Sequence, residues 1–543
     1  MRARSWLVAG SILAVAFSAV VQARATGGTD VAGVPAACVG ENGPVPNANV
    51  PGCTIDGYTN GFEVVAHVPM KAAGLTTDGL GNNGAVALVG TCAYVGRWHD
   101  YTGSRGVQIV DVDPASPSRY TIVGSVAGTT TAGATPRELR AVDLPGFKML
   151  AVLTFSNSLT NRGDQQLNTL RFFDATDCRH PIPFGSVSVG PQTVALPSRY
   201  DLLADRPHEF YLWVDPDHSH WPSPTHPRML AFITVPLEPP NLLVVDASDP
   251  SLPRLITSFD AAQPPVSLEE AGNTYLGNYA HSISLTPDGT RALLSYWDGG
   301  FLVVDTSDLA AASPAPVIKL IGEASTPYDY SPPDFGNTHS AVKIPGKEYA
   351  VVGDEVYGGI DGCPYGHMRI VTLGSLTESP HEVGHFGLAE NDPSHCDTST
   401  GMFTDITTPS GKIVDGTFTM HNQTLLGNFV VTTWYGGGLR VVDVSHPEAP
   451  AEVASFVPVP LSTVRYQTDI VGPPLRRGLG NAPLSQWNVE SWSYPVIRGG
   501  LIYMTDIRSG LYILRPVSGS PFADAVAAKG FDEGNSDLGD IIG

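Results

Sequence analysis

Basic residues are scarce in this chain: Lys and Arg together number 31 against 53 Asp and Glu, and charged residues make up only 15% of the sequence. The resulting net charge of −22 argues against nucleic acid and anionic membranes as partners, because both require a cationic surface. What the chain has in abundance is Gly (58) and Pro (46), a composition typical of many tight turns and few amphipathic helices.

Long apolar runs are also rare, and the one that approaches the roughly 18 residues needed to span a bilayer lies at the N-terminus. Arg2 and Arg4 precede this apolar run over residues 6–21, and the run is followed by Ala23-Arg24-Ala25, a small-x-small cleavage site. Residues 1–25 therefore predict a signal peptide, and the Gly- and Pro-rich sequence behind it argues against an uncleaved anchor. We expect an exported protein, periplasmic or extracellular, with no transmembrane segment.

Several catalytic signatures are missing. The sequence has no Gly-x-Ser-x-Gly elbow, no phosphate-binding loop, no haem-attachment Cys-x-x-Cys-His and no His-Glu-x-x-His.

A short pattern recurs along the chain: a small residue, four mostly apolar residues and an aspartate. Successive copies lie ~60–70 residues apart, which indicates one supersecondary unit repeated around the whole chain. Five clear copies occupy residues 106–111, 169–174, 241–246, 300–305 and 438–443, and two degenerate copies occupy 366–372 and 510–515.

Each period contains four short runs rich in β-branched and aromatic residues and bounded by Gly, Pro or Asp. In the fourth unit these runs are 281–285, 291–296, 301–305 and 316–321, and in the sixth they are 421–425, 429–433, 439–443 and 451–456. Four antiparallel strands per repeat are typical of a β-propeller blade. We predict an all-β, seven-bladed β-propeller; six or eight blades are the alternatives if the first or fifth unit is misread.

The last unit supplies only three predicted strands, over 489–494, 501–505 and 511–514. Residues 61–68 resemble the outer strand of the sixth unit, so we expect this N-terminal strand to complete the last blade and close the ring. The predicted organisation is a signal peptide (1–25), an N-terminal extension (26–60), the propeller (61–516) and an acidic, Gly-rich tail (517–543).

The segments Leu242–Pro250 and Leu439–Pro447 resemble the LVIVD repeat of exported bacterial and archaeal propeller proteins. That resemblance implies the fold and is silent on chemistry. Residues 291–305 are similar to one blade of the selenium-binding protein and methanethiol oxidase family, and this more distant likeness implies a His-lined metal site. This likeness covers a single blade, and no motif of that family can be assigned to this chain residue by residue.

Four histidines occupy the same place in consecutive units, the first residue of the innermost strand: His208, His281, His339 and His421. Innermost strands surround the central channel, so these imidazoles should converge at one mouth of it. A ring of neutral imidazoles suits a transition metal ion such as Cu, Zn or Fe. The alternative is that each histidine only packs or caps its strand. The equivalent position is Glu490 in the seventh unit and Arg137 or Glu138 in the second.

The turns between the second and third strands open on the same face and add two candidates for acid/base catalysis. Glu355 sits where other units place a turn glycine, and Tyr357 follows it closely. Glu490 is the third catalytic candidate, as an acid/base or a further ligand.

Six cysteines, an even number in a chain expected to be exported, predict three disulfides. The same face assignment places Cys92 near Cys178 and Cys363 near Cys396, and leaves Cys38 with Cys53, although six cysteines allow other connectivities.

Two functions fit these features. The first is a metal-dependent enzyme, an oxidoreductase or a hydrolase or lyase, acting on a small molecule at the histidine ring. The second is a non-catalytic surface or periplasmic scaffold that binds its ligand with long loops, with structural histidines. The metal-dependent enzyme is favoured, because the four histidines occupy equivalent positions in consecutive units.

Overall fold

The structure is a computed structural model that describes most of the chain in segments. These are residues 29–40, 43–70, 83–97, 106–128, 134–156, 168–189, 207–235, 240–261, 278–297, 299–326, 337–356, 364–397, 402–403, 406–407, 413–461 and 485–529. The predicted signal peptide lies outside the described residues.

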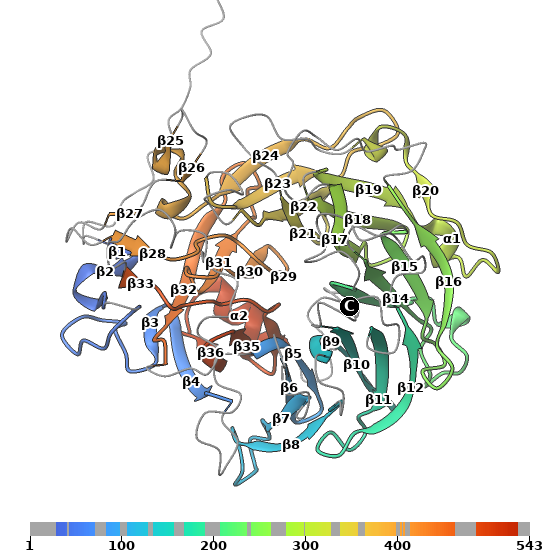
Figure 1. The fold of residues 1–543 in the computed structure, drawn as a ribbon, viewed down its shortest axis with the longest axis horizontal. Helices are drawn as coiled ribbons and strands as arrows, with labels where there is room; N and C mark the ends of the chain where they lie inside the picture. Colours follow the sequence, from blue (N-terminus) through green and yellow to red (C-terminus); the bar gives the residue numbers. More distant parts are fainter. Residues whose placement is uncertain are drawn as a thin grey trace, which may run out of the picture.

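The strands group into four-stranded antiparallel sheets arranged radially around a central axis, so the fold is an all-β propeller (Figure 1). Blade one contains β5 (Asn83–Val89), β6 (Cys92–Arg97), β7 (Val107–Asp111) and β8 (Ile122–Val126). Blade two contains β9 (Ala134–Leu144), β10 (Phe147–Ser156), β11 (Thr169–Asp174) and β12 (Ile182–Ser188). Blade three contains β13 (Phe210–Val214), β14 (Met229–Thr234), β15 (Leu242–Asp246) and β16 (Arg254–Phe259).

Blades four and five are joined by a single bridge between Trp297 and Thr338. Blade four contains β17 (Asn278–Leu285), β18 (Arg291–Trp297), β19 (Phe301–Asp305) and β20 (Lys319–Leu320), and helix α1 (Ser307–Ala310) follows β19. Blade five contains β21 (Thr338–Lys343), β22 (Tyr349–Asp354), β23 (Met368–Thr372) and β24 (Glu382–Phe386).

The last two blades recruit strands from the N-terminus. Blade six contains β29 (Gln423–Leu426), β30 (Phe429–Thr433), β31 (Leu439–Asp443) and β32 (Ala451–Pro458), and β3 (Gly57–Asn60) is added at its outer edge. Blade seven contains β34 (Val496–Arg498), β35 (Leu501–Asp506), β36 (Gly510–Pro516) and β4 (Phe62–Val68). The described residues thus form seven units of four strands each, with blade six extended by β3 as a fifth strand, and the N-terminal strand β4 completes the last one as predicted.

Short elements decorate the ring. Near the N-terminus these are β1 (Thr29–Val31), β2 (Val34–Pro35) and the 3-10 turn Ala36–Cys38. Elsewhere they are β25 (Cys396–Asp397), β26 (Met402–Phe403), β27 (Ile406–Thr407), β28 (Ile413–Asp415) and β33 (Ser485–Gln486), together with 3-10 turns at His218–His220, Gly322–Ser325, Ala389–Asn391 and Pro393–His395. Among the described residues, no helix has the length and hydropathy required to cross a bilayer.

The recurring sequence pattern forms the third strand of each blade, and its aspartate has a local structural role. The carboxylates of Asp246, Asp305 and Asp443 each accept a hydrogen bond from the backbone N–H two residues later, at 2.8–3.0 Å. This is an Asx-turn, which closes the connection to the outer strand. The glycine that precedes the strand has positive φ, as in Gly438 (φ 76°), where an added Cβ would lie 2.1 Å from the carbonyl oxygen of Phe456.

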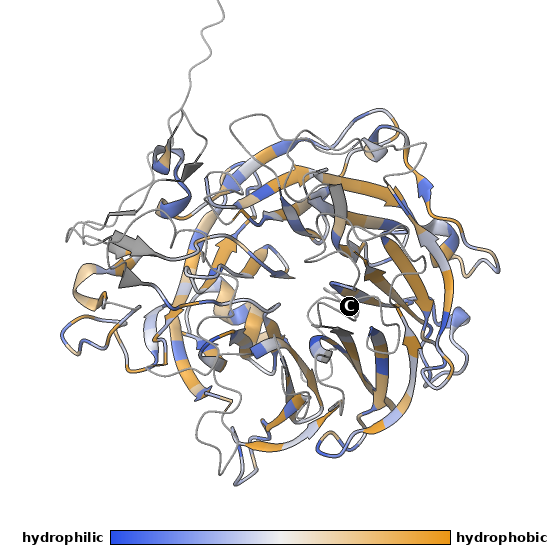
Figure 2. Ribbon diagram, in the orientation of Figure 1, coloured by the Kyte–Doolittle hydropathy of each residue, from blue (hydrophilic) through white to orange (hydrophobic). Residues whose placement is uncertain are grey.

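The core lies between blades rather than within one. Apolar residues run along the strands, as the hydropathy colouring of Figure 2 shows. One cluster, for example, packs Trp213 and Phe232 of blade three against Leu294 and Tyr296 of blade four. The inner strands of each sheet therefore bury both faces, which explains why they read as nearly continuous apolar runs, whereas outer strands such as β12 and β16 are largely exposed or half-buried.

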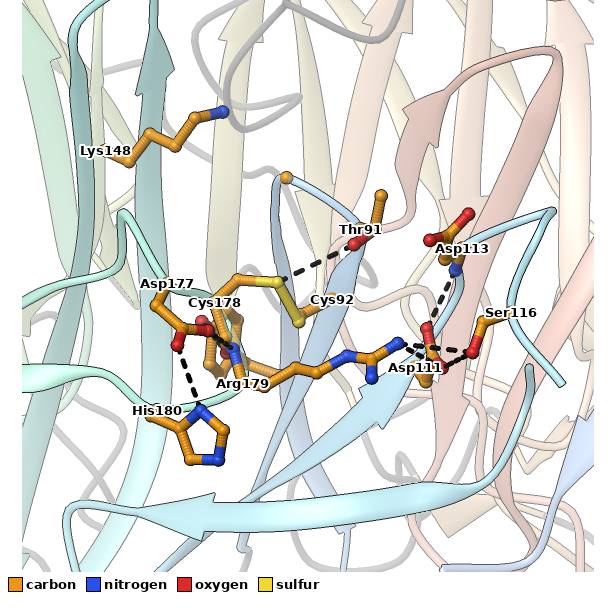
Figure 3. The surroundings of a disulfide bond; sticks show 12 residues. Thr91, Cys92, Asp111, Asp113, Ser116, Lys148, Asp177, Cys178, Arg179 and His180 are labelled. Atoms are coloured by element: carbon orange, nitrogen blue, oxygen red, sulfur yellow. Dashed lines mark hydrogen bonds and ion pairs between the residues drawn. A yellow bond between two sulfur atoms is a disulfide. The ribbon is translucent and has the colours of Figure 1, made fainter. Parts of the chain in front are cut away.

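Two of the predicted disulfides are present. Cys38 pairs with Cys53 inside the N-terminal segment, and Cys92 of blade one pairs with Cys178 of blade two (Figure 3). Cys396 is also disulfide-bonded, and its predicted partner Cys363 lies outside the described residues. Beside the inter-blade disulfide, Arg179 donates to Asp111 at 2.7 Å, which adds a second tie between blades one and two.

The structure corrects one predicted strand and adds a helix within the predicted tail. The innermost strand of blade seven is Val496–Arg498 and not 489–494, because the latter segment meets β35 only at an isolated bridge between Ser491 and Asp506. The predicted tail begins with helix α2 (Pro521–Ala528), whose Phe522 and Val526 are buried against blades six and seven. In the sequence, the helical spacing of these apolar residues is masked by the Gly- and Asp-rich residues around the helix.

Candidate metal centre

The four predicted histidines converge near the axis of the ring. None of them is the first residue of its innermost strand, contrary to the prediction from the sequence: His281 and His339 lie within β17 and β21, and His208 and His421 precede β13 and β29 by two residues. The ring centroids of successive imidazoles are 4.2 Å (His208–His281), 4.1 Å (His281–His339) and 4.1 Å (His339–His421) apart. Radial repetition alone places these side chains together, since equivalent positions in neighbouring blades face the same axis.

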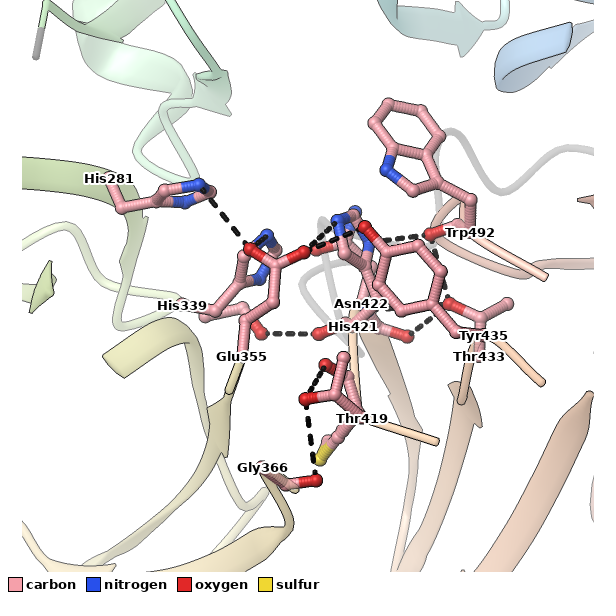
Figure 4. A network of polar contacts seen from close by, with 12 residues as sticks. His281, His339, Glu355, Gly366, Thr419, His421, Asn422, Thr433, Tyr435 and Trp492 are labelled. Atoms are coloured by element: carbon pink, nitrogen blue, oxygen red, sulfur yellow. Dashed lines mark hydrogen bonds and ion pairs between the residues drawn. The ribbon is translucent and has the colours of Figure 1, made fainter. Parts of the chain in front are cut away.

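Glu355 reaches three of these imidazoles (Figure 4). It directly follows β22, as the turn reading predicted. One carboxylate oxygen, Oε2, lies 3.9 Å from Nε2 of His281 and 3.6 Å from Nε2 of His339, and the other, Oε1, lies 3.5 Å from Nε2 of His421. The hydroxyl of Tyr435 in blade six donates to Oε1 of Glu355 at 2.7 Å.

A second carboxylate, Glu209, escaped the sequence reading although it follows His208 directly. Its Oε1 lies 3.9 Å from Nε2 of His339, and the hydroxyl of Tyr494 donates to its Oε2 at 3.1 Å. Each carboxylate of the site is thus held by a tyrosine. In the sequence, Glu209 could be recognised only from the alternation of residues along the strand. That alternation does not distinguish a glutamate that faces the axis from one that faces solvent.

The donor atoms form two overlapping triads, Glu209–His281–His339 and His339–Glu355–His421, each with its ligand atoms within 4.8 Å of one another. Metal bonds of ~2.0–2.2 Å require donors no more than ~4 Å apart, so small side-chain rotations would bring either triad onto one ion. Neutral imidazoles with carboxylates form a donor set suited to Zn, Fe or Cu.

Hydrogen bonds fix the tautomer of His421. Its Nδ1 lies 2.7 Å from the carbonyl oxygen of Trp492, which can only accept, so Nδ1 carries the proton and Nε2 presents its lone pair towards Glu355. Nε2 of His339 lies 3.6 Å from Oε2 of Glu355, beyond hydrogen-bond distance, although its side chain is only 1% exposed. A buried polar atom left in this state is unusual unless a ligand completes it.

Burial keeps these imidazoles neutral. It lowers the pKa of His339 to about 3, with a further contribution from the Arg137 guanidinium, and it lowers the pKa of His281 and His421 well below the ordinary value. Burial also raises the pKa of the Glu209 carboxyl, with Glu138 adding to the effect. Neutral imidazoles keep the lone pairs that metal coordination requires.

Aromatic side chains enclose the cluster, and two of them have strained backbones. Trp297 stacks on His281 at 4.8 Å between centroids, and Tyr435 and Trp492 each lie 5.0 Å from His421. Trp297 (φ 49°) and Tyr435 (φ 34°) both adopt positive φ, which costs a bulky L-residue on the order of 1 kcal/mol or more. Trp297 ends the second strand of blade four, and Tyr435 lies in the turn between the second and third strands of blade six. Glycine would be unstrained at both positions, so the backbone strain is retained where these rings contact the histidines.

The other predicted catalytic residues are placed differently. Glu490 is not in either triad: Arg508 donates to its Oε1 at 2.6 Å, and its backbone N–H donates to Asp506 at 2.7 Å. Burial raises the pKa of Glu490 to about 7. This placement follows from the displaced innermost strand of blade seven. Because residue 490 precedes that strand, it is not equivalent to the histidines of blades four to six. Tyr357 lies outside the described residues.

The hydrogen bond from Tyr435 allows a sharp prediction. Tyr435→Phe keeps the ring and the backbone but removes the donor that orients Glu355, so we expect metal affinity to fall about 10- to 100-fold, the usual effect of losing a partner of a ligand. Competition with a chromophoric chelator measures this. Tyr365→Phe is the matched control, since it loses an equally buried hydrogen bond, to the carbonyl oxygen of Gly416 at 2.6 Å, in the same region. Equal affinities in the two variants would contradict the prediction.

The arrangement of the strands defines the class of this protein, a β-propeller. The family model of the LVIVD repeat matches residues 239–261 and 424–457, which confirms the resemblance predicted from the motifs. No curated protein matches the chain.

Similar solved structures include Sqt1 from Chaetomium thermophilum, with 13% identity, a TM-score of 0.40 and coverage of 84% of this chain and 87% of that one. A hypothetical selenium-binding protein from Sulfolobus tokodaii has 13% identity and a TM-score of 0.41, covering 77% of this chain and 82% of that one. A putative 6-phosphogluconolactonase from Bacteroides fragilis has 9% identity and a TM-score of 0.41, covering 80% and 96%.

Proposed function

We propose that this protein is a metal-dependent enzyme acting on a small molecule, with one transition metal ion held on the propeller axis by the triad His339–Glu355–His421 and with His281 beside it. The observation that carries the proposal is the contact of one buried carboxylate, Glu355, with all three imidazoles at 3.5–3.9 Å. Burying a carboxylate beside three neutral imidazoles costs free energy, because these polar groups lose their hydration unless a bound ligand compensates for it.

The residues have separable roles. His339, His421 and Glu355 hold the ion, Glu355 is also the acid/base group that can take up or release a proton beside it, and Tyr435 orients Glu355. The aromatic rings of Trp297 and Trp492 limit the access of water. A bound transition metal supplies Lewis acidity and, if it is redox-active, one-electron chemistry, so hydrolysis or elimination and oxidation are the reaction classes to screen.

We further propose that the protein is exported, to the periplasm or beyond. The disulfides Cys38–Cys53 and Cys92–Cys178 are typical of oxidising compartments, and the predicted signal peptide agrees with them. The alternative, a non-catalytic scaffold that binds its ligand through surface loops, keeps the fold and the disulfides but requires no metal.

Elemental analysis of the purified mature protein tests the proposal. We expect about one equivalent of Zn, Fe or Cu per chain after reconstitution and removal of loosely bound ions. A folded protein that takes up none of these metals would overturn the enzyme proposal and leave the scaffold.

A further inference from the structure

The segment 490–492 ties blade seven to the candidate metal centre. It precedes the innermost strand β34 and lies outside the regular strands of the blade. The carbonyl oxygen of Trp492 lies 2.7 Å from Nδ1 of His421, and the backbone N–H of Ser491 donates to the carbonyl oxygen of Tyr435 at 3.1 Å. The segment therefore contacts both a ligand of the proposed ion and the tyrosine that orients the acid/base carboxylate.

One buried carboxylate fixes this segment to the turn that joins β35 and β36. Asp506 is the last residue of β35 and is fully buried. Its Oδ2 accepts a hydrogen bond from the backbone N–H of Glu490 at 2.7 Å, and its Oδ1 accepts from the backbone N–H groups of Arg508 and Ser509 at 3.0 and 2.8 Å. The carboxylate therefore joins the segment to the turn through charge-assisted hydrogen bonds.

The two contacts of the segment set properties that an ion in the triad requires. Because a carbonyl oxygen can only accept, Trp492 keeps the proton of His421 on Nδ1 and leaves Nε2 for the ion. Tyr435 has a strained backbone (φ 34°), and its carbonyl oxygen accepts from Ser491 at 3.1 Å and from Gly438 of its own turn at 3.0 Å. Both contacts of the segment cross from blade seven to blade six, so packing within blade six does not provide them.

We propose that Asp506 is a positioning residue of the metal centre: by fixing segment 490–492, it holds the tautomer of His421 and the position of Tyr435. This inference rests on the proposed metal-dependent function and extends its machinery into blade seven. It also gives the segment around Glu490 a role that the sequence did not indicate, since Glu490 contributes its backbone N–H and not its carboxylate.

Asp506→Asn tests the proposal in the full-length protein. Whichever way the new amide turns, its NH2 group faces a backbone N–H, so hydrogen bonds to segment 490–492 or to the turn are lost. We expect the folded variant to bind one equivalent of Co(II) with an affinity about 10-fold lower than that of the wild type, and with a changed visible spectrum.

Nitrogen-15 NMR of the metal-free, histidine-labelled protein provides a second readout that does not depend on metal. The wild type should show His421 with its proton on Nδ1, and Asp506→Asn should add a population with the proton on Nε2. The signals of His421 are assigned by their absence in His421→Gln. A purely structural role of Asp506 would lower stability and leave this tautomer unchanged in the folded protein.

Asp111→Asn is the matched control. Asp111 is equally buried and, like Asp506, accepts a hydrogen bond from the backbone N–H two residues later at 3.0 Å, but it lies beside the disulfide of blades one and two (Figure 3). Its substitution should change neither the Co(II) affinity nor the spectrum. Asp506→Ser is the second variant if the amide variant does not fold, because its hydroxyl can still accept within the turn, and it should show the same losses.

Each other result has a distinct meaning. An Asp506 variant with wild-type affinity, spectrum and His421 tautomer would overturn the inference while the proposed function stands. Equal losses in Asp111→Asn would also overturn it, since they would reflect general destabilisation. A wild-type protein that takes up no metal would overturn the proposed function and the inference with it.

Discussion

Replacing His339 by alanine will abolish stoichiometric metal binding. His339 is shared by both triads of donor atoms and is nearly fully buried, so no solvent molecule enters easily to replace its imidazole. Removing a hydrogen-bonding partner of a ligand already costs 10- to 100-fold in affinity, and removing the ligand itself should cost more than about 100-fold.

Inductively coupled plasma analysis after dialysis against a weak chelator gives the stoichiometry, and isothermal titration gives the affinity. His446→Ala is the control, since this histidine is 78% exposed on a turn of blade six and should leave the metal content unchanged. Thermal unfolding of the metal-free proteins separates loss of the ligand from loss of the fold. A His339→Ala variant that is folded and still binds one equivalent tightly would rule out the proposed centre.

Removing the disulfide between blades one and two by Cys92→Ala with Cys178→Ala will strongly destabilise the protein. The two cysteines are separated by 86 residues, and in the chain-entropy model closing a loop of this length in the unfolded state contributes about 4.5 kcal/mol. The disulfide is buried, so the substitutions also leave a small cavity.

Urea unfolding followed by tryptophan fluorescence measures the loss. The matched control is Cys38→Ala with Cys53→Ala, whose loop of 15 residues predicts a smaller loss of about 3 kcal/mol from the same model. Equal losses from the two pairs, or a loss below about 1 kcal/mol from the inter-blade pair, would contradict the loop-length argument.

Much of the fold could be read from local patterns. The run Phe301–Asp305 is apolar on both faces, starts after a glycine and ends with an aspartate that closes its own turn, so strand type, length and boundary are all encoded within six residues. The strand that closes the ring was also predictable, because β4 resembles the outer strand of another blade. Helix α2 and the displaced β34 were not, since their positions depend on packing against blade seven rather than on a repeated motif.

The candidate site was predictable only as a set of equivalent positions. Repetition identified the four histidines, and the turn reading identified Glu355. Nothing in the sequence separates His208 from its three counterparts, because its contact with Arg137 joins residues that are 71 apart along the chain. Glu209 was missed for the same reason, since its contact with His339 crosses from blade three to blade five.

The sequence by itself determined the strands, the repeat, the closing strand and the ring of histidines, because each depends on periodicity and turn chemistry that act over a few residues. Only the tertiary structure decided which imidazoles meet Glu355, which one faces Arg137, and which tyrosines hold the two carboxylates. These contacts join different blades, and their distances depend on how seven packed sheets set the width of the axis around which they stand.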